Sequence, residues 1–237
     1  TKKLSRKRKP VILWKVGHAN STKEAVFSHT GGIAGKKEIW ASLSNQTGII
    51  RVNNSEELIS LAMAFNYLSL DKISNKLGIV SVGGGSSIET SEQMENQGLM
   101  IPKLETTTID KLREFLPEVN TIFRNPLDLG GKGMRAEFFS KTLVTLEEDP
   151  NVSVIIFIKS YYFDQEFINA ILNAKKKISK PLICIAPKVR DNLEEYKELL
   201  IFKKRLFKAG IPVFESINLT AKALKKMVQY KNFLEKI

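Results

Sequence analysis

One stretch of the sequence decides the fold class: Leu77-Gly-Ile-Val-Ser-Val-Gly-Gly-Gly-Ser-Ser87. It begins as a continuous apolar run, which buried parallel strands require. It ends in a glycine-rich turn, and an amphipathic stretch follows from Ser87. A strand, a glycine turn and a helix in this order are typical of a βαβ unit, so the sequence predicts an α/β protein built on parallel sheets.

The same alternation extends in both directions from this stretch. Short apolar runs predict strands at 11–16, 48–52, 77–82, 152–158, 182–185 and 212–214. Amphipathic intervals predict helices at 55–68, 87–97, 108–116, 136–148, 163–177, 192–209 and 219–234. Because crossovers between parallel strands need helices, we expect residues from about 77 to 237 to form a five-stranded parallel sheet covered on both faces.

A polar connection at 70–76 divides the chain into two parts. We expect one domain at 1–71 and a second at 72–237. The first part offers only two strands, too few for a self-sufficient sheet, so we expect it to be the C-terminal part of a larger domain. Its basic start leads to Lys9-Pro10, which predicts the tail of a helix before a strand.

Composition limits the class of function. The chain has 237 residues with 43% hydrophobic content, enough to bury a sizeable core. No run of about 18 apolar residues occurs and the N-terminus lacks an apolar signal region, so we expect a soluble, cytoplasmic protein without a membrane partner. The single cysteine, Cys184, lies in an apolar run, which favours core packing over a disulfide or a thiolate metal site.

The formal charge of +12 raises the possibility of nucleic-acid binding, because basic surfaces attract phosphate backbones. Six of the first ten residues are basic, however, and much of the other lysine lies on predicted helical faces such as 175–177. Aromatic and basic residues do not interleave along any predicted strand as in a base-stacking surface. A solvated basic surface is therefore the favoured interpretation, and salt-dependent retention on DNA would test the other.

A histidine lies in the loop Ser28-His-Thr-Gly-Gly-Ile-Ala-Gly35, between the first predicted strand and a helical stretch. Glycines allow close backbone approach, and the free N–H groups of a helix start favour an anion. A neutral imidazole there, His29, can attack phosphorus and hold a covalent phosphoryl group. From the residues alone, a capped loop with an incidental histidine stays open, because glycine-rich turns before helices are common.

A second glycine loop follows the strand at 77–82, at the carboxyl edge where doubly wound sheets bind ligands. Two helix starts suited to anions suggest one shared phosphate between them. The phosphate-binding residues we expect are Ser28, Thr30, Gly31, Gly32, Gly35, Gly83, Gly84, Gly85, Ser86 and Ser87. We expect Asn125 and Asp128 of the motif Asn125-Pro-Leu-Asp128 to support the site, and an Asx-type turn and helix start stays equally open. His18 is interpreted as a loop residue, and two histidines do not favour a metal site.

The ordered motifs resemble those of the ADP-forming acyl-CoA synthetases, relatives of succinyl-CoA synthetase. The strand and histidine loop at 9–17 and 28–35 resemble the family's phosphohistidine region. The segments that resemble the family's second flavodoxin-like domain are Gly83-Gly-Gly85, Leu112-Arg-Glu-Phe-Leu-Pro117, Asn125-Pro-Leu-Asp128 and Ala209-Gly-Ile-Pro-Val-Phe214. The resemblance implies two flavodoxin-like units, of which the first lacks its N-terminal half.

The resemblance also implies a reaction: acyl-CoA, ADP and phosphate give carboxylic acid, CoA and ATP, reversibly, through an acyl phosphate and a phosphohistidine. His29 matches that histidine. ATP or ADP, CoA, phosphate and Mg²⁺ are then expected in the complete enzyme, with none bound tightly by this chain. The implied partners are a CoA-binding Rossmann domain, an ATP-grasp domain or subunit and a small carboxylic acid, and an oligomer is expected.

The sequence departs from the family pattern at two places. The second glycine loop continues as Ser86-Ser87, where proline or alanine and then glycine is common, and Gly32 stands where serine or alanine is common. These departures keep a rival open, a non-catalytic or regulatory module that retains the fold, as in protein acetyltransferase fusions. Phosphorylation of His29 separates the two interpretations.

Overall fold

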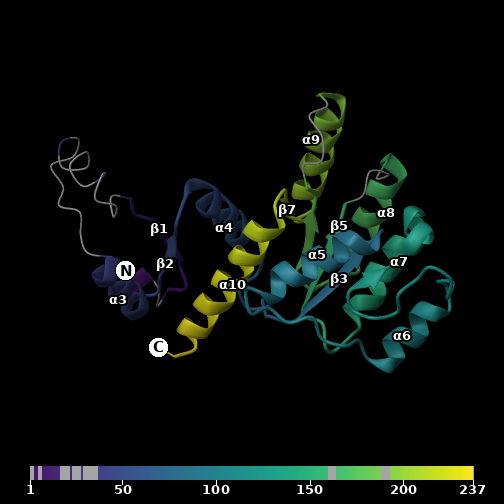
Figure 1. Ribbon diagram of the computed structural model, residues 1–237, viewed down its shortest axis with the longest axis horizontal. Coiled ribbons are helices and arrows are strands. Elements are labelled where there is room, and N and C mark those ends of the chain that lie inside the picture. The colour runs from purple at the N-terminus through teal and green to yellow at the C-terminus, as the bar shows by residue number, and fades with distance from the viewer. Residues whose placement is uncertain are drawn as a thin grey trace.

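Two parallel sheets with helices packed on them make up the computed structural model of the protein, which describes residues 3–4, 7–16, 22, 28, 37–159, 164–187 and 193–236. A small sheet of two strands lies toward the N-terminus, and a sheet of five strands lies in the rest of the chain (Figure 1). The α/β class predicted from the sequence is confirmed.

The large sheet is parallel throughout, with the strand order β4-β3-β5-β6-β7. Its first strand in sequence therefore lies second from one edge, which is the flavodoxin-like order. The strands are β3 Leu77–Ser81, β4 Leu127–Asp128, β5 Val154–Ile158, β6 Leu182–Ile185 and β7 Val213–Phe214. The expected five-stranded parallel sheet is confirmed, but its fifth strand is β4, which was not among the four strands predicted from residue 77 onward.

Side chains of β5 show how both faces of this sheet are buried. Val154, Ile156 and Ile158 pack into one hydrophobic core, and Ile155 and Phe157 pack into the other. Successive residues of a strand point to opposite faces, so a continuous apolar run fills two cores at once.

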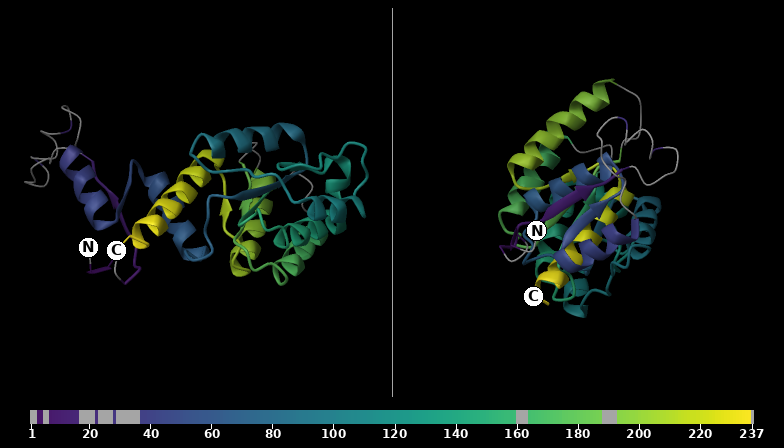
Figure 2. Two further views of the ribbon diagram at one scale, coloured as in Figure 1. Left: turned by 90° about the horizontal axis from the view of Figure 1, so that it is seen from below. Right: turned by 90° about the vertical axis from the view of Figure 1, so that its left-hand side faces the viewer.

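The helices form two layers around the large sheet (Figure 2). One core involves α6 Thr106–Arg113, α7 Ala136–Glu147, α8 Gln165–Lys175 and α9 Leu193–Lys208. The other core involves α4 Ser55–Tyr67, α5 Gly84–Glu95 and α10 Ile217–Leu234.

The small sheet pairs β1 Val11–Trp14 with β2 Ile49–Val52 in parallel, and α3 Lys37–Thr47 precedes β2. Ile50 and Val52 of β2 belong to the same core as Leu224 and Met227 of α10. The C-terminal helix α10 therefore packs against the early part of the chain as well as the large sheet. The proposed division into 1–71 and 72–237 stays a prediction.

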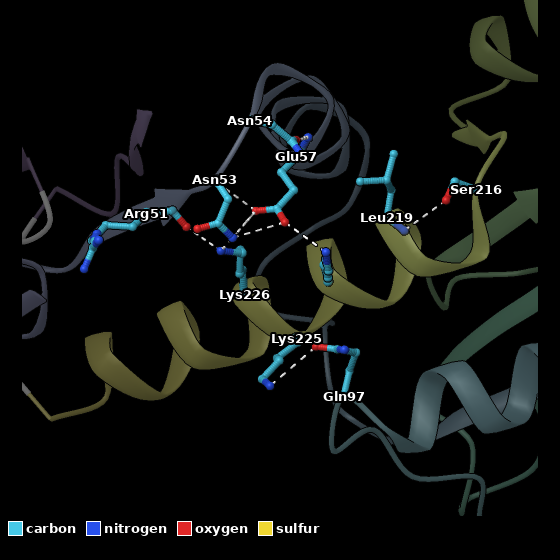
Figure 3. A network of polar contacts seen from close by, with 10 residues as sticks. Arg51, Asn53, Asn54, Glu57, Gln97, Ser216, Leu219, Lys225 and Lys226 are labelled. Atoms are coloured by element: carbon cyan, nitrogen blue, oxygen red, sulfur yellow. Dashed lines mark hydrogen bonds and ion pairs between the residues drawn. The ribbon is translucent and has the colours of Figure 1, made fainter. Parts of the chain in front are cut away.

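A buried carboxylate joins α10 to α4. The Glu57 side chain is 3% exposed, and its Oε1 accepts a hydrogen bond of 3.0 Å from Nζ of Lys222. Lys226 Nζ lies 3.8 Å from Oε2 of the same carboxylate, and Asn53 donates to it from its backbone and its side-chain amide (Figure 3). These contacts hold the two helices in register.

One helix start differs from the prediction, and the motif at 125–128 contains a strand that was not predicted. Asp128 Oδ1 accepts from the Gly130 N–H two residues on, and the 3-10 helix η1 Gly130–Met134 begins there, so the Asx-type turn and helix start are present. Leu127–Asp128 in addition forms a parallel strand beside β3. The strand is only two residues long and depends on its neighbour β3. Helix α5 begins at Gly84, three residues before the predicted start, because backbone at the glycines already follows the helix.

Cys184 is fully buried in β6, which confirms its predicted place in the core. Burial raises the pKa of its thiol far above the ordinary value. Among the described residues, the structure has no helix with the length and apolar character needed to cross a membrane.

Candidate functional site

The second glycine loop lies where the sequence predicts it, at the carboxyl edge of the large sheet. β3 ends at Ser81, and Gly83 immediately precedes α5 with φ 118° and ψ 123°. This backbone conformation is open to glycine and strained for other residues. Gly83 has no side chain to cap the helix, so the first N–H groups of α5 depend on other partners.

Asp128 supplies one such partner from the neighbouring strand. Its Oδ1 accepts hydrogen bonds from the N–H of Gly83 at 2.9 Å and of Gly130 at 3.0 Å. A Cβ on Gly84 would lie 3.2 Å from Oδ2, so glycine gives the carboxylate room beside the helix start. The helix N-terminus thus already has one anion close by, and this anion fixes the turn.

The two serines of the loop make their bonds within the helix. Ser86 Oγ donates to the Gly83 carbonyl at 3.0 Å, and Ser87 Oγ donates to the Gly84 carbonyl at 2.8 Å. Ser87 is buried, whereas Gly83 and Gly85 are exposed and Gly84 and Ser86 are partly exposed. A phosphate at this loop would meet backbone N–H groups first, and Ser86 would have to rotate its hydroxyl to join them.

Asn125 makes side-chain hydrogen bonds to the backbone of β3, at residues that precede the glycine loop. Its Oδ1 accepts from the Ile79 N–H at 3.0 Å, and its Nδ2 donates to the carbonyls of Leu77 at 2.6 Å and Pro102 at 2.9 Å. β4 is too short to pair with this part of β3, so the amide takes the place of a longer strand. Asn125 positions the backbone and does not itself face the turn.

The histidine loop lies outside the described residues, which omit His29, Thr30, Gly31, Gly32 and Gly35. His18 is omitted as well, and Ser28 is described as a helical, exposed residue. The expectation that the two glycine loops face each other across one phosphate therefore stays a prediction.

Two residues at the carboxyl edge were missed by the sequence reasoning. Gly130 donates to Asp128, and with φ 52° a Cβ there would lie 2.1 Å from the Asn120 carbonyl oxygen. Lys159 directly follows β5 and lies over the Phe202 ring, with Nζ 5.6 Å from the ring centroid. Burial lowers the pKa of Lys159. A lysine placed directly after an apolar strand was the signal that could have found it.

Similarity to known proteins bears on what this edge does. Residues 1–65 match the family model of the succinyl-CoA ligase like flavodoxin domain. Over 94% of the chain, the sequence is 32% identical to the α subunit of ADP-forming acetate–CoA ligase II of Pyrococcus furiosus. The chain is a homologue of the ADP-forming acyl-CoA synthetases. The resemblance seen in the sequence motifs is confirmed.

Other synthetases of this family match shorter parts of the chain. The ADP-forming 4-hydroxybutyrate–CoA ligase of Nitrosopumilus maritimus is 34% identical over 66% of the chain, which is 21% of that protein's length. The Pyrococcus furiosus α subunit is covered over 48% of its length. The chain thus spans about half or less of the synthetases it matches.

Solved structures agree with the fold. A crystal structure from Pyrococcus horikoshii superposes with a TM-score of 0.74 at 26% identity, over 98% of this chain and 48% of that one. The acetyl-coenzyme A synthetase 1 of Ca. Korarchaeum cryptofilum, in complex with phosphate and ADP, gives a TM-score of 0.80 at 21% identity, over 99% of this chain and 50% of that one. The second likeness concerns the fold alone.

Proposed function

We propose that this chain carries the phosphoryl-relay part of an ADP-forming acyl-CoA synthetase, with His29 as the residue that carries the phosphate. The observation behind the proposal is the homology over 94% of the chain together with the glycine turn before α5 at the carboxyl edge of the large sheet. In the complete enzyme, acyl-CoA, ADP and phosphate would give carboxylic acid, CoA and ATP through an acyl phosphate.

The described residues suit the anion-binding half of this relay. Asp128 holds Gly83, so the first turn of α5 keeps one orientation toward the sheet edge. The N–H groups of a helix start carry partial positive charge and favour a phosphate without a counter-cation. On the other loop, a neutral imidazole attacks phosphorus without needing a separate base, which suits His29.

The remaining parts of the reaction require other domains or subunits. We propose a CoA-binding Rossmann domain and an ATP-grasp domain as partners, an oligomeric enzyme and a cytoplasmic location. Among the described residues, no group of three or more His, Cys, Asp or Glu side chains fits a metal ion. We propose that Mg²⁺ enters with the nucleotide, whose phosphate oxygens suit it as ligands.

The test is phosphorylation of the complete enzyme by labelled ATP and Mg²⁺. We expect an acid-labile, base-stable phosphate on His29, and we expect His29→Ala to abolish both this label and ATP formation. His18→Ala is the matched control, because it removes the other histidine of the chain and should leave both signals. A label on Ser28 or Thr30, or near wild-type ATP formation by His29→Ala, would show that His29 is not the phosphate carrier. The interpretation as a non-catalytic module would then be favoured.

A further inference from the structure

A hollow runs along β2, between α3 and α10, in a part of the molecule that the proposed relay does not use. Its volume is about 410 Å³. The polar residues that line it include Asn45 of α3, Arg51 of β2, and Lys226 and Gln229 of α10. Gly48, at the start of β2, and Phe233 of α10 line it as well.

Two cations, Arg51 and Lys226, line this hollow, and two more, Lys222 and Lys225, lie near enough to act on Lys226. Burial lowers the pKa of Lys226, and the nearby charges of Lys222, Arg51 and Lys225 lower it further, while Glu57 opposes them. Glu57 is thus the one carboxylate among the groups that act on Lys226 in the described chain. Four cations around one carboxylate repel each other, and an added anion would relieve that repulsion.

The two cations that line the hollow differ in how they are held. Two contacts hold the Lys226 ammonium group in place: its Nζ donates to the Arg51 carbonyl and lies 3.8 Å from Oε2 of Glu57. Among the described residues, the Arg51 guanidinium has no hydrogen-bond or ion-pair partner, and Figure 3 shows it pointing away from this network. Arg51 therefore keeps all its donors for a ligand.

An aromatic ring, that of Phe233, lines the hollow beside Gly48. A Cβ on Gly48 would lie 2.4 Å from Cε1 of Phe233, so only glycine lets the ring lie this close to the start of β2. Asn45 and Gln229 add amide groups that can donate hydrogen bonds beside the cations. The walls thus combine charge, neutral donors and one apolar ring.

We propose that this hollow binds a phosphate-bearing anion, with Arg51 and Lys226 as its charged ligands. The planar fork of Arg51 matches two phosphate oxygens, and Lys226 adds a point charge already fixed in place. The amides of Asn45 and Gln229 would complete the hydrogen bonds to the anion. The shared chemistry is a diphosphate group, which inorganic pyrophosphate and a nucleoside diphosphate both carry.

Isothermal titration calorimetry of the purified protein with inorganic pyrophosphate tests the site. We expect saturable binding that Arg51→Gln and Lys226→Gln each weaken about tenfold or more, since each removes a charge-assisted hydrogen bond. Arg113→Gln is the matched control, because it makes the same charge change on α6, where Arg113 has its own acidic neighbours. That control should stay within about twofold of the wild type.

A second arm of the titration uses ADP and distinguishes the two sources of a diphosphate. If the ligand is a nucleotide, we expect ADP to bind more tightly than pyrophosphate, and Phe233→Leu to lower the affinity for ADP alone. If the ligand is inorganic, we expect Phe233→Leu to leave both affinities unchanged. Circular dichroism verifies that each variant folds. The proposal fails if the wild type shows no saturable binding, or if Arg51→Gln and Arg113→Gln weaken it equally, which would indicate diffuse attraction to a basic surface.

Discussion

The Asn125 side chain makes hydrogen bonds to the part of β3 that the short strand β4 does not reach. Three groups of the main chain, at Leu77, Ile79 and Pro102, use its amide as their hydrogen-bond partner. Such groups cost free energy when they are buried without partners. The amide therefore acts as part of β4 without belonging to it.

We predict that Asn125→Ala lowers the free energy of unfolding by about 2 to 3 kcal/mol, because three backbone groups lose their partner. Asn125→Asp is the informative companion, since it keeps the acceptor for Ile79 and loses the two donated bonds. Urea denaturation measures both. If Asn125→Ala unfolds within about 0.5 kcal/mol of the wild type, water already satisfies these groups.

Residue roles were harder to predict from the sequence than residue positions. The motif at 125–128 was expected to support the site, but the bond from Gly83 to Asp128 was not predicted, because it depends on the pairing of Ser81 with Asp128 across two strands. No local pattern reports that register. The role of His29 rests on the resemblance to the family, since a glycine-rich loop alone admits a plainer interpretation.

At the scale of elements, the contact between α4 and α10 depends on Glu57. Burial tends to raise the pKa of its carboxyl group, but hydrogen bonds from the Asn53 backbone and from Lys222 and Asn53 side chains, with the charge of Lys226, lower it overall. A carboxyl group whose pKa is lowered by folding stabilises the protein above its unfolded pKa of about 4.3. This stability is lost as the pH falls through the folded pKa.

We predict that Glu57→Gln lowers the free energy of unfolding near neutral pH by about 2 kcal/mol, because it leaves two lysines without their carboxylate. The difference from the wild type should shrink as the pH falls from about 7 to about 3. Glu56→Gln, an exposed neighbour in the same first turn, is the control and should show a small difference. Urea titrations across this pH range measure the difference. If it stays constant with pH, the charge of Glu57 does not cause the loss of stability.

The two ends of α5 offer a matched pair of glycines. Gly83 precedes the helix with φ 118°, and Gly98 follows it with φ 78°, and neither has an atom within 4 Å of an added Cβ. We predict that both alanine variants lose about 1 to 2 kcal/mol of stability through backbone strain. Only Gly83→Ala should lower ATP formation by the complete enzyme, by about tenfold, since it shifts the helix start. Equal activity of the two variants would contradict a role for this turn.

Elements whose own sequence is apolar or amphipathic could be predicted. Elements that form only because they pair with a neighbouring strand could not. β5 reads as a strand because Val154 to Ile158 is apolar throughout and fills both cores. β4 has two residues after a proline, so its strand character comes from β3. The start of α5 was placed late because three glycines in a row suggest a turn, although the backbone at Gly84 and Gly85 is already helical.

At the scale of the whole molecule, α10 packs against two parts of the structure, the early segment and the large sheet. It packs along α4 and β2 and also against α5 and the large sheet (Figure 1). Leu224 and Met227 are fully buried in this shared core. The early segment and the large sheet should therefore unfold together.

We predict one unfolding transition in urea, seen alike by two probes. Trp14 and Trp40, the two tryptophans, both lie in the early segment, whereas circular dichroism follows all the helices. Leu224→Ala should lower the free energy of unfolding by about 3 kcal/mol and move both transitions together, because it leaves a cavity in the shared core. A tryptophan transition that precedes the loss of helix would show that α10 does not couple the two parts.

The place of α10 has a consequence for biosynthesis. β2 and α4 leave the ribosome before α10, the helix that covers them, which ends at Leu234. At ordinary rates of synthesis, about 10 to 30 seconds separate the two events. During that interval Leu61 and Ala64, fully buried in the finished protein, lack their packing partner. The nascent chain exposes this apolar helix face during the interval, and we expect a chaperone that shields such faces to act on it.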